Sequence, residues 1–284
     1  MEQVVLEVKG LKFKYRDAEK WVLKGLDFQV KKGEFLCIIG SNGSGKSTLC
    51  NALVGLIPYY FAGKMKGQIL VDGIDTRESS IAELSSRIGL VFQNPFNQLS
   101  YTAGSVAEEL AYGLGNQGIP REAMVKRVEH VAKLMRIDHI IHKNPLELSG
   151  GQVQRVAFGS TFIMEPGILV LDECTTQLDP LGSEEIFDIV KELNKNGVTV
   201  IMVDHDMERV ARCADRILVL DQGEQAAVDT PGNIFGNPET MAHHIGAPDY
   251  VAITRRLKEQ NLYDGPVKVI EEETIKLVRE VMAV

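Results

Sequence analysis

The stretch that decides the fold is GSNGSGKSTL at residues 40–49, which continues the apolar run FLCIIG at 35–40. It fits the pattern G-x-x-x-x-G-K-[ST] through Gly40, Gly45, Lys46 and Ser47. The pattern is meaningful only when a strand precedes it and a helix follows it, and both are expected here. The stretch therefore predicts a phosphate-binding loop that joins a buried strand to a helix.

Each residue type in this loop suits a phosphate ligand. Glycines let backbone N–H groups curl around phosphate oxygens, and the following helix directs its unpaired N–H groups at them. Lys46 brings a positive charge to the β- and γ-phosphates, and Ser47 offers a hydroxyl to Mg²⁺. We expect nucleotide contacts from the whole loop, namely Gly40, Ser41, Asn42, Gly43, Ser44, Gly45, Lys46, Ser47 and Thr48.

A second acidic motif stands far along the chain, in ILVLDE at 168–173. An apolar strand that ends in Asp172 places a carboxylate at the sheet edge where phosphate-binding-loop proteins hold Mg²⁺. Glu173 follows and could accept a proton from an attacking water or orient it. The alternative is an ordinary acidic pair at the end of a strand.

The segment LSGGQ at 148–152 opens a helical stretch. Ser149 and Gln152 have the spacing of a capping box. Gly150 and Gly151 are poor helix formers, and their presence is explained if the helix amino end lies against phosphate oxygens. Capping and phosphate contact are compatible roles for this segment.

Short apolar runs alternate with helical patterns, which predicts an α/β sheet of mostly parallel strands. The expected strands are 34–40, 168–172, 199–204 and 216–221, with helices at 181–195 and 206–214. The N-terminal third favours antiparallel strands, residues 104–163 are almost wholly helical, and the pattern changes again after Gly223.

Composition restricts the function classes. The 284 residues carry a net charge of −8, which argues against non-specific nucleic-acid binding. The four cysteines have no metal-ligand spacing, and His243–His244 has no supporting ligand cluster, so we expect a reducing compartment and a solvated histidine pair. The first ten residues do not resemble a signal peptide, and no apolar run reaches membrane-spanning length, so a membrane role would require partners.

The phosphate-binding loop, LSGGQ and LVLDE, in this order, resemble the ATP-binding cassette of ABC proteins over roughly residues 4–228. The resemblance implies an ATPase that uses ATP and Mg²⁺. It implies an α/β fold with a RecA-like core, an N-terminal antiparallel subdomain and a helical subdomain at about 96–163. We divide the chain into a nucleotide-binding domain at 1–228 and an extension at 229–284, with dimerisation as the extension's candidate role.

The resemblance also assigns roles to single residues. Tyr15 matches the aromatic residue that stacks on adenine, although it could simply be a strand aromatic. Gln93, in LVFQNP, matches the glutamine that senses Mg²⁺ and water and faces the membrane partner. Asp179 matches the segment that crosses to a second cassette, and Ser149 would act on that cassette's nucleotide. His205 matches the switch histidine near the γ-phosphate, although a structural histidine is the alternative.

Three positions depart from the family pattern. Cys174 stands where proline is usual, Gln177 where a small residue is common, and Val153 where a polar residue is usual. None of them removes a catalytic group. The first two are expected beside the seam between two cassettes, where they would affect communication between sites.

Within the family, FQNPFNQL and VAEELAYGLGNQGIP resemble the ATPases of energy-coupling factor (ECF) transporters, importers of vitamins and transition-metal ions. This resemblance implies a place at the cytoplasmic face of the cell membrane. The implied partners are a second ATPase subunit, identical or paralogous, a transmembrane (T) component and a substrate-binding (S) component. The alternatives are a soluble ABC ATPase that remodels or assembles a protein partner, and an ATPase of another importer subgroup.

Two apolar segments have no assigned partner. Phe96, Leu99 and Tyr101 follow Gln93 in the loop 94–104, where we expect them either to be exposed for docking or to fold onto the helical subdomain. In the last helical stretch, Ile275, Val278 and Met282 share one expected apolar face.

Overall fold

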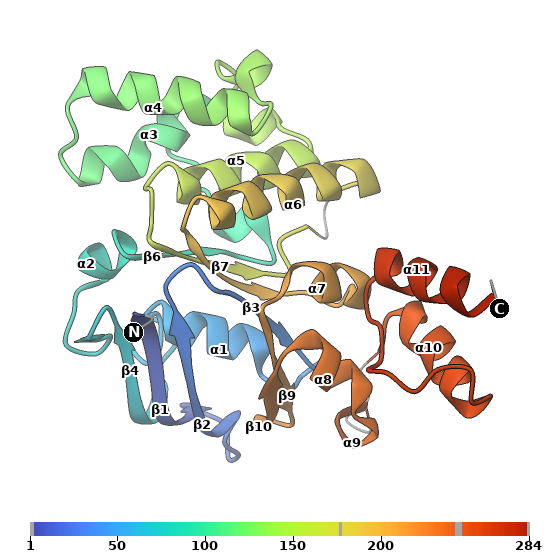
Figure 1. Cartoon of the computed structure of the whole chain (residues 1–284). Coiled ribbons are helices and arrows are strands. Elements are labelled where there is room, and N and C mark those ends of the chain that lie inside the picture. The colour runs from blue at the N-terminus through green and yellow to red at the C-terminus, as the bar shows by residue number, and fades with distance from the viewer. Residues whose placement is uncertain (1–2, 176–177, 242–245, 283–284) are drawn as a thin grey trace.

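The computed structural model describes residues 3–175, 178–241 and 246–282. Two sheets and their covering helices make up the described part of the chain (Figure 1). The strands are β1 (Val4–Tyr15), β2 (Leu23–Lys31), β3 (Phe35–Ile39), β4 (Gly63–Val71), β5 (Ile74–Asp75), β6 (Ile88–Val91), β7 (Ile168–Asp172), β8 (Thr199–Val203), β9 (Arg216–Asp221) and β10 (Glu224–Asp229). The helices are α1 (Lys46–Leu53), α2 (Ile81–Ser85), α3 (Val106–Asn116), α4 (Arg121–Leu134), α5 (Gly150–Phe162), α6 (Pro180–Lys195), α7 (Met207–Cys213), α8 (Pro231–Gly236), α9 (Pro238–Met241), α10 (Asp249–Glu259) and α11 (Glu271–Met282).

The larger sheet has the strand order β10-β9-β3-β8-β7-β6. All neighbouring pairs are parallel except β10 with β9, which confirms the expected α/β class. Every residue of β3, β7 and β8 is buried, because helices or the second sheet cover both faces. The parallel strands bring Gly40, Gln93, Glu173 and His205 toward one edge of the sheet, where each follows the carboxyl end of its strand.

The smaller sheet is antiparallel, with the order β2-β1-β4-β5. Its buried side chains, such as Leu6 and Phe13, share a core with Leu49 of α1 and with Ile38 on one face of the larger sheet. Helix α1 therefore lies in a layer between the two sheets (Figure 1). This packing fixes the helix that begins at the phosphate-binding loop.

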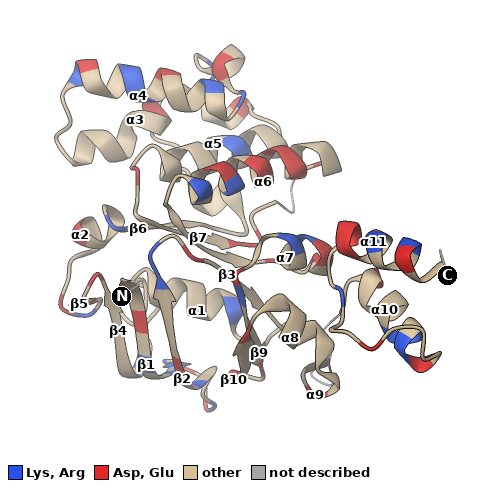
Figure 2. Ribbon diagram, in the orientation of Figure 1, with Lys and Arg blue, Asp and Glu red and all other residues tan. Residues whose placement is uncertain are grey.

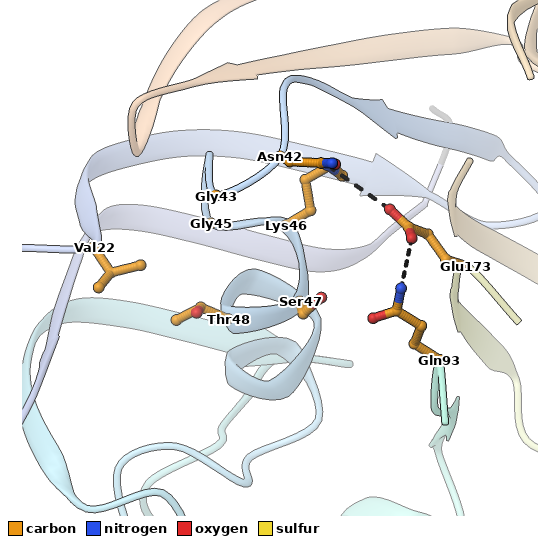
Figure 3. Close-up of a pocket in the computed structure, with 9 residues that line it drawn as sticks. All are labelled: Val22, Asn42, Gly43, Gly45, Lys46, Ser47, Thr48, Gln93 and Glu173. Carbon is orange, nitrogen blue, oxygen red and sulfur yellow. Dashed lines mark hydrogen bonds and ion pairs between the residues drawn. The ribbon is translucent and has the colours of Figure 1, made fainter. Parts of the chain in front are cut away.

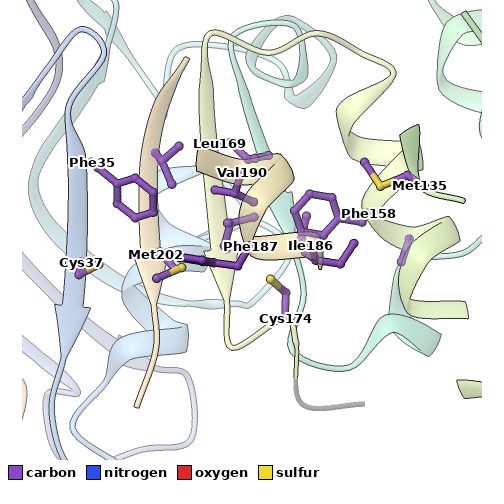
Figure 4. Close-up of a cluster of buried hydrophobic side chains, with 14 of the residues drawn as sticks. Phe35, Cys37, Met135, Phe158, Leu169, Cys174, Ile186, Phe187, Val190 and Met202 are labelled. Atoms are coloured by element: carbon purple, nitrogen blue, oxygen red, sulfur yellow. The ribbon is translucent and has the colours of Figure 1, made fainter. Parts of the chain in front are cut away.

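The other face of the larger sheet packs against helices. Phe158 of α5 and Phe187 of α6 join Leu169 of β7 in a second core (Figure 4). Helices α3 and α4 lie outside α5, so the expected helical subdomain is present (Figure 1). In the loop before it, only Phe96 of the three expected apolar residues is exposed. Leu99 is buried and Tyr101 half-buried, because both pack into this second core, so the alternative in which the loop folds onto the helical subdomain holds for these two residues.

The C-terminal extension packs on the helical side of the larger sheet. Phe235 of α8 and Val251 of α10 belong to the second core. Helix α11 buries Thr274 and Leu277, whereas Ile275 and Met282 are exposed. The expected apolar face is therefore not the packed one, because the neighbouring face of the helix lies against the protein.

Candidate nucleotide-binding site

Two glycines set the curve of the phosphate-binding loop between β3 and α1. Gly45 is the N-cap of α1 and has a φ of 106°, which L side chains rarely adopt. Gly40 is required by a close approach, because a Cβ there would lie 2.1 Å from the Leu220 carbonyl oxygen. The curved loop leaves the amino end of α1 facing the centre of the loop, where its N–H groups can bind an anion.

The Lys46 ammonium is held by its own loop and by a carboxylate. Its Nζ donates to the carbonyl oxygens of Gly40 at 2.9 Å and Ser41 at 3.2 Å. The same Nζ lies 3.8 Å from Glu173 Oε1, and 8% of the lysine side chain is exposed. This positive charge is therefore poorly screened by water and acts strongly on a nearby phosphate.

A cavity of about 410 Å³ opens over the loop. Gln93, which follows β6, and Glu173, which follows β7, form the wall opposite α1 (Figure 3). Gln93 Nε2 donates to Glu173 Oε2 at 2.7 Å, which turns the amide oxygen toward the α1 side of the cavity (Figure 3). The lining residues are Val22, Asn42, Gly43, Gly45, Lys46, Ser47, Thr48, Gln93 and Glu173.

Glu173 has an uncommon backbone conformation, with a φ of 45°. Non-glycine residues in this region carry strain that persists only where the surroundings hold it. Here the Glu173 N–H donates to the Val203 carbonyl of β8 at 3.2 Å. The backbone is thereby fixed with the carboxylate between Lys46 and Gln93.

Asp172 ends β7 next to the cavity and is almost completely buried. Its Oδ1 has no hydrogen-bond partner within the described residues. Burial raises the pKa of Asp172, and the Ser47 hydroxyl opposes that rise. A carboxylate, a hydroxyl and an amide oxygen are the hard donors that Mg²⁺ prefers. The residues Ser47, Gln93 and Asp172 therefore fit the expected Mg²⁺ ligand set.

Tyr15 and His205 are among the expected site residues that lie outside the cavity lining. Tyr15 packs edge-on against Phe13 with ring centroids 4.9 Å apart, and its hydroxyl lies 3.0 Å from the Thr48 hydroxyl. His205 follows β8 and is exposed. Val22, which carried no recognisable signal in the sequence, lines the cavity instead. The roles of Tyr15 at adenine and His205 at the γ-phosphate stay predictions.

The LSGGQ segment is placed in a different part of the chain's surface. Ser149 is the N-cap of α5, followed by Gly150 and Gly151, and Gln152 Oε1 accepts a hydrogen bond from the Ser149 N–H at 3.1 Å. The segment borders a cavity of about 220 Å³ that also contacts Asp179. The two cavities share no lining residue, so the chain does not bring LSGGQ onto its own phosphate-binding loop.

Two of the three positions that depart from the family pattern lie within the described residues, and both are buried. Cys174 is buried in the second core, and burial raises its thiol pKa to about 12. It therefore packs as a small apolar residue, and its expected place beside the seam between two cassettes stays a prediction. Val153 is also buried, which accounts for an apolar side chain there. Gln177 and the His243–His244 pair lie outside the described residues.

Across the described ranges, the helices lack the combination of length and apolar character that a bilayer crossing requires. The family model of ABC transporters matches residues 23–176. The energy-coupling factor transporter ATP-binding protein EcfA1 of Bacillus subtilis is 41% identical over 261 residues, covering 91% of this chain and 90% of the relative.

Two solved structures resemble the fold closely. That of cbiO1 from Clostridium perfringens, part of the ABC transporter complex cbiONQ, has a TM-score of 0.71 at 34% identity and covers 86% of this chain and 94% of its own. A dimeric post-hydrolysis structure of the ATP-binding cassette MJ0796 with ADP and Pi has a TM-score of 0.70 at 29% identity and covers 80% of this chain and 98% of its own. With its phosphate-binding loop, its LSGGQ helix and relatives aligned along nearly its whole length, the chain belongs to the ABC transporter family, as an ATP-binding ATPase of the energy-coupling factor type.

Proposed function

We propose that this chain is the ATP-hydrolysing subunit of an ECF importer, where it couples ATP hydrolysis to uptake of a vitamin or a transition-metal ion. A separate S component would select that substrate. The observation that carries the proposal is the 2.7 Å hydrogen bond between Gln93 and Glu173. It joins the residue assigned to water activation to the segment assigned to the membrane partner.

Within one chain, the loop at 40–48 holds the triphosphate through its backbone N–H groups and Lys46. Glu173 accepts a proton from the attacking water or orients it. His205, at the same sheet edge, donates to the γ-phosphate. The loop N–H groups, Lys46 and His205 act where negative charge develops in the transition state. They therefore lower the barrier to hydrolysis more than they strengthen ground-state binding of ATP.

The metal role is assigned to Ser47, Gln93 and Asp172. Mg²⁺ in this set would supply positive charge to the β- and γ-phosphate oxygens. Asp172 supports that assignment because its Oδ1 is buried without a partner. Gln93 would contribute its amide oxygen, because its amide nitrogen is hydrogen-bonded to Glu173.

The second half of each site is assigned to another cassette, identical or paralogous. Ser149 is exposed and lies away from its own chain's loop, so the amino end of α5 is placed to contact nucleotide held by the partner. The dimeric MJ0796 relative supports this arrangement. The exposed Ile275 and Met282 give α11 an outward apolar face, which supports a dimerisation role for the 229–284 extension.

We assign an apolar groove of about 230 Å³ to a helix of the T component. Leu56, Ile81 and Phe92 contribute to its lining. Phe96, with 48% of its surface exposed, lies three residues after Gln93 and outside the lining of this groove, and we assign it to the same docking surface. A partner docked here at the cytoplasmic membrane face would respond when Gln93 moves at the phosphate.

The test is a pull-down of the tagged chain with membranes from its host. Phe96→Asp and, separately, Ile81→Asp place a charge in the apolar docking surface, so each should lose most membrane association while basal ATPase activity of the purified chain persists. Val125→Asp is the matched control, because Val125 on α4 is also 48% exposed. We expect it to retain binding.

Retained membrane association of both docking variants would overturn the assignment of the groove. Recovery of wild-type protein without any integral membrane protein would favour the soluble remodelling ATPase instead. A thermal melt of each variant identifies unfolding, because a folded variant melts in one transition near the wild-type temperature.

A further inference from the structure

The two segments assigned to the second cassette begin beside the same cavity. Helix α5 starts after Ser149 and α6 starts after Asp179, and both residues line the cavity of about 220 Å³. Asp179 Oδ1 accepts a hydrogen bond from the Gly182 N–H at 2.7 Å, whereas Ser149 is capped through Gln152. Each cap lies within its own helix, so the caps do not fix one helix end relative to the other.

Arg155 of α5 makes the connection between the helices. Its Nη2 donates to Glu185 Oε2 of α6 at 2.7 Å, and its Nη1 donates to the Met135 carbonyl oxygen at the end of α4 at 3.2 Å. The side chains of Arg155 and Glu185 are 15% and 19% exposed. A pair so shielded interacts more strongly than an exposed surface pair, and the planar guanidinium holds both donors in fixed directions.

Gly182 provides the room that this contact needs. A Cβ at Gly182 would lie 2.9 Å from Asp179 Oδ1 and 3.3 Å from Arg155 Nη2. A larger residue there would press on the cap of α6 and on the ion pair together. A glycine at position 182 therefore leaves room both for the cap of α6 and for the ion pair that links α6 to α5.

Adjacent acidic residues of α6 pair with different helices, so Glu185 has a role that its neighbour Glu184 does not share. Figure 2 shows the acidic turn of α6 beside a basic position of α5. Glu184 pairs instead with Arg209 and Arg212 of α7, at 3.3 and 3.1 Å. Arg136 also pairs with Glu185, but 67% of its side chain is exposed, so that pair contributes less.

We propose that Glu185 is a positioning residue that locks the amino end of α5 to the amino end of α6 through Arg155. The Ser149 and Asp179 segments then meet the second cassette as one rigid surface, and the dimer does not have to order them on closing. The inference rests on the proposed head-to-tail function. It adds that the partner-facing half-site is preorganised by this ion pair.

The test compares full-length chains in a Glu173→Gln background, in which hydrolysis should not consume the ATP. Glu185→Gln keeps the shape of the side chain and removes its charge. With Mg²⁺ and ATP as the probe, nucleotide affinity of the monomer should stay within about twofold. The dissociation constant of the ATP-bound dimer, measured by sedimentation, should rise about tenfold, which lies within the range of coupling between contacting groups.

Further variants test the geometry around the ion pair and the effect of charge alone. Gly182→Ala changes no charge and favours the helix, yet it should also weaken the dimer because its Cβ presses on the Asp179 cap and on Arg155 together. Asp188→Asn removes an equal charge from an exposed position of the same helix and should leave the dimer unchanged. The double variant Arg155→Met with Glu185→Gln completes a double-mutant cycle. Arg155→Met should weaken the dimer less in the Glu185→Gln background than in the parent, because the ion pair is already broken there.

An unchanged dimer constant for Glu185→Gln would overturn the proposal, as would equal weakening by Asp188→Asn. Loss of nucleotide binding by the monomer would place the defect in the chain's own site and also overturn it. If Glu185→Gln does not fold, Arg155→Met decides by the same two measurements, because it removes the other member of the pair. Failure of the parent chain to dimerise with ATP, both alone and with a paralogous cassette from its host, would instead overturn the head-to-tail function. That outcome is distinguishable because it is seen before any change is made at Glu185.

Discussion

The phosphate-binding loop and the LSGGQ segment each lie at a helix amino end that we assign to phosphate, but the chain supports them differently. Lys46 is largely buried, donates hydrogen bonds to two loop carbonyls and forms an ion pair with Glu173. Ser149 is exposed, and near it a largely shielded ion pair links α5 to α6. The first half-site is stabilised by the core between the sheets, and the second by the core beneath α5 and α6 together with this ion pair.

This difference indicates how binding and turnover can be separated. A helix between two sheets cannot shift without disturbing the core, so nucleotide binding by the loop is expected to be largely preformed. A helix end at the surface can be repositioned at lower cost, so closure onto a partner is the step open to regulation. Substitutions in the first half-site should therefore affect chemistry or affinity, and those in the second should affect assembly.

The largest expected effect belongs to Glu173→Gln. Gln retains a hydrogen-bonding group for Gln93 and removes the charge that accepts a proton, so the rate of ATP hydrolysis should fall by about 10²–10⁴-fold. ATP affinity should persist, because the loop and Lys46 remain, and the ATP-bound dimer should accumulate. Steady-state phosphate release and sedimentation measure the two outcomes. Activity within a few-fold of the parent would remove Glu173 from the role of base.

Ser149→Arg is expected to have a smaller effect on chemistry and a selective effect on assembly. The substitution puts a bulky cation at the positive end of α5, where the partner's phosphate should dock. Monomer affinity for ATP should stay unchanged while ATP-driven dimerisation fails and hydrolysis falls with it. Calorimetry of the monomer is decisive: weakened binding there would place Ser149 in its own chain's site and contradict the two-chain arrangement.

The sequence predicts much of the fold because its signals are local. The buried strands β3, β7 and β8 are apolar runs, and the loop before α1 is identified by its glycines and Lys46. Contacts set by tertiary packing carry no such signal. The cavity contact of Val22 and the burial of Leu99 depend on segments far away in the chain, and so do the partners of Arg155. The sequence also does not predict which face of α11 packs against the protein. Two adjacent faces of this helix carry apolar residues, and tertiary contacts decide which of the two is buried.

The smallest expected effect concerns Asp172, whose Oδ1 is buried without a partner. Because burial raises its pKa, folding favours the protonated carboxyl. The stabilising contribution of that proton is complete below the unfolded pKa and is lost as pH rises through the folded pKa. At neutral pH the ionised group therefore destabilises the fold, and Asp172→Asn should raise the melting temperature in EDTA by about 2–4 °C, the equivalent of ~1 kcal/mol.

That gain should shrink as the pH falls toward acid, because the wild-type carboxyl then takes up its proton. With Mg²⁺ and ATP the order should reverse: wild type gains stability from a bound metal, and Asp172→Asn lacks the anionic ligand for it. Differential scanning calorimetry in EDTA and in Mg-ATP, each at neutral and acid pH, gives all four values. A lower melting temperature for Asp172→Asn in EDTA would show that the carboxylate stabilises the loop half-site by itself. That result would contradict the inference that the buried Asp172 carboxylate destabilises the fold until Mg²⁺ binds to it.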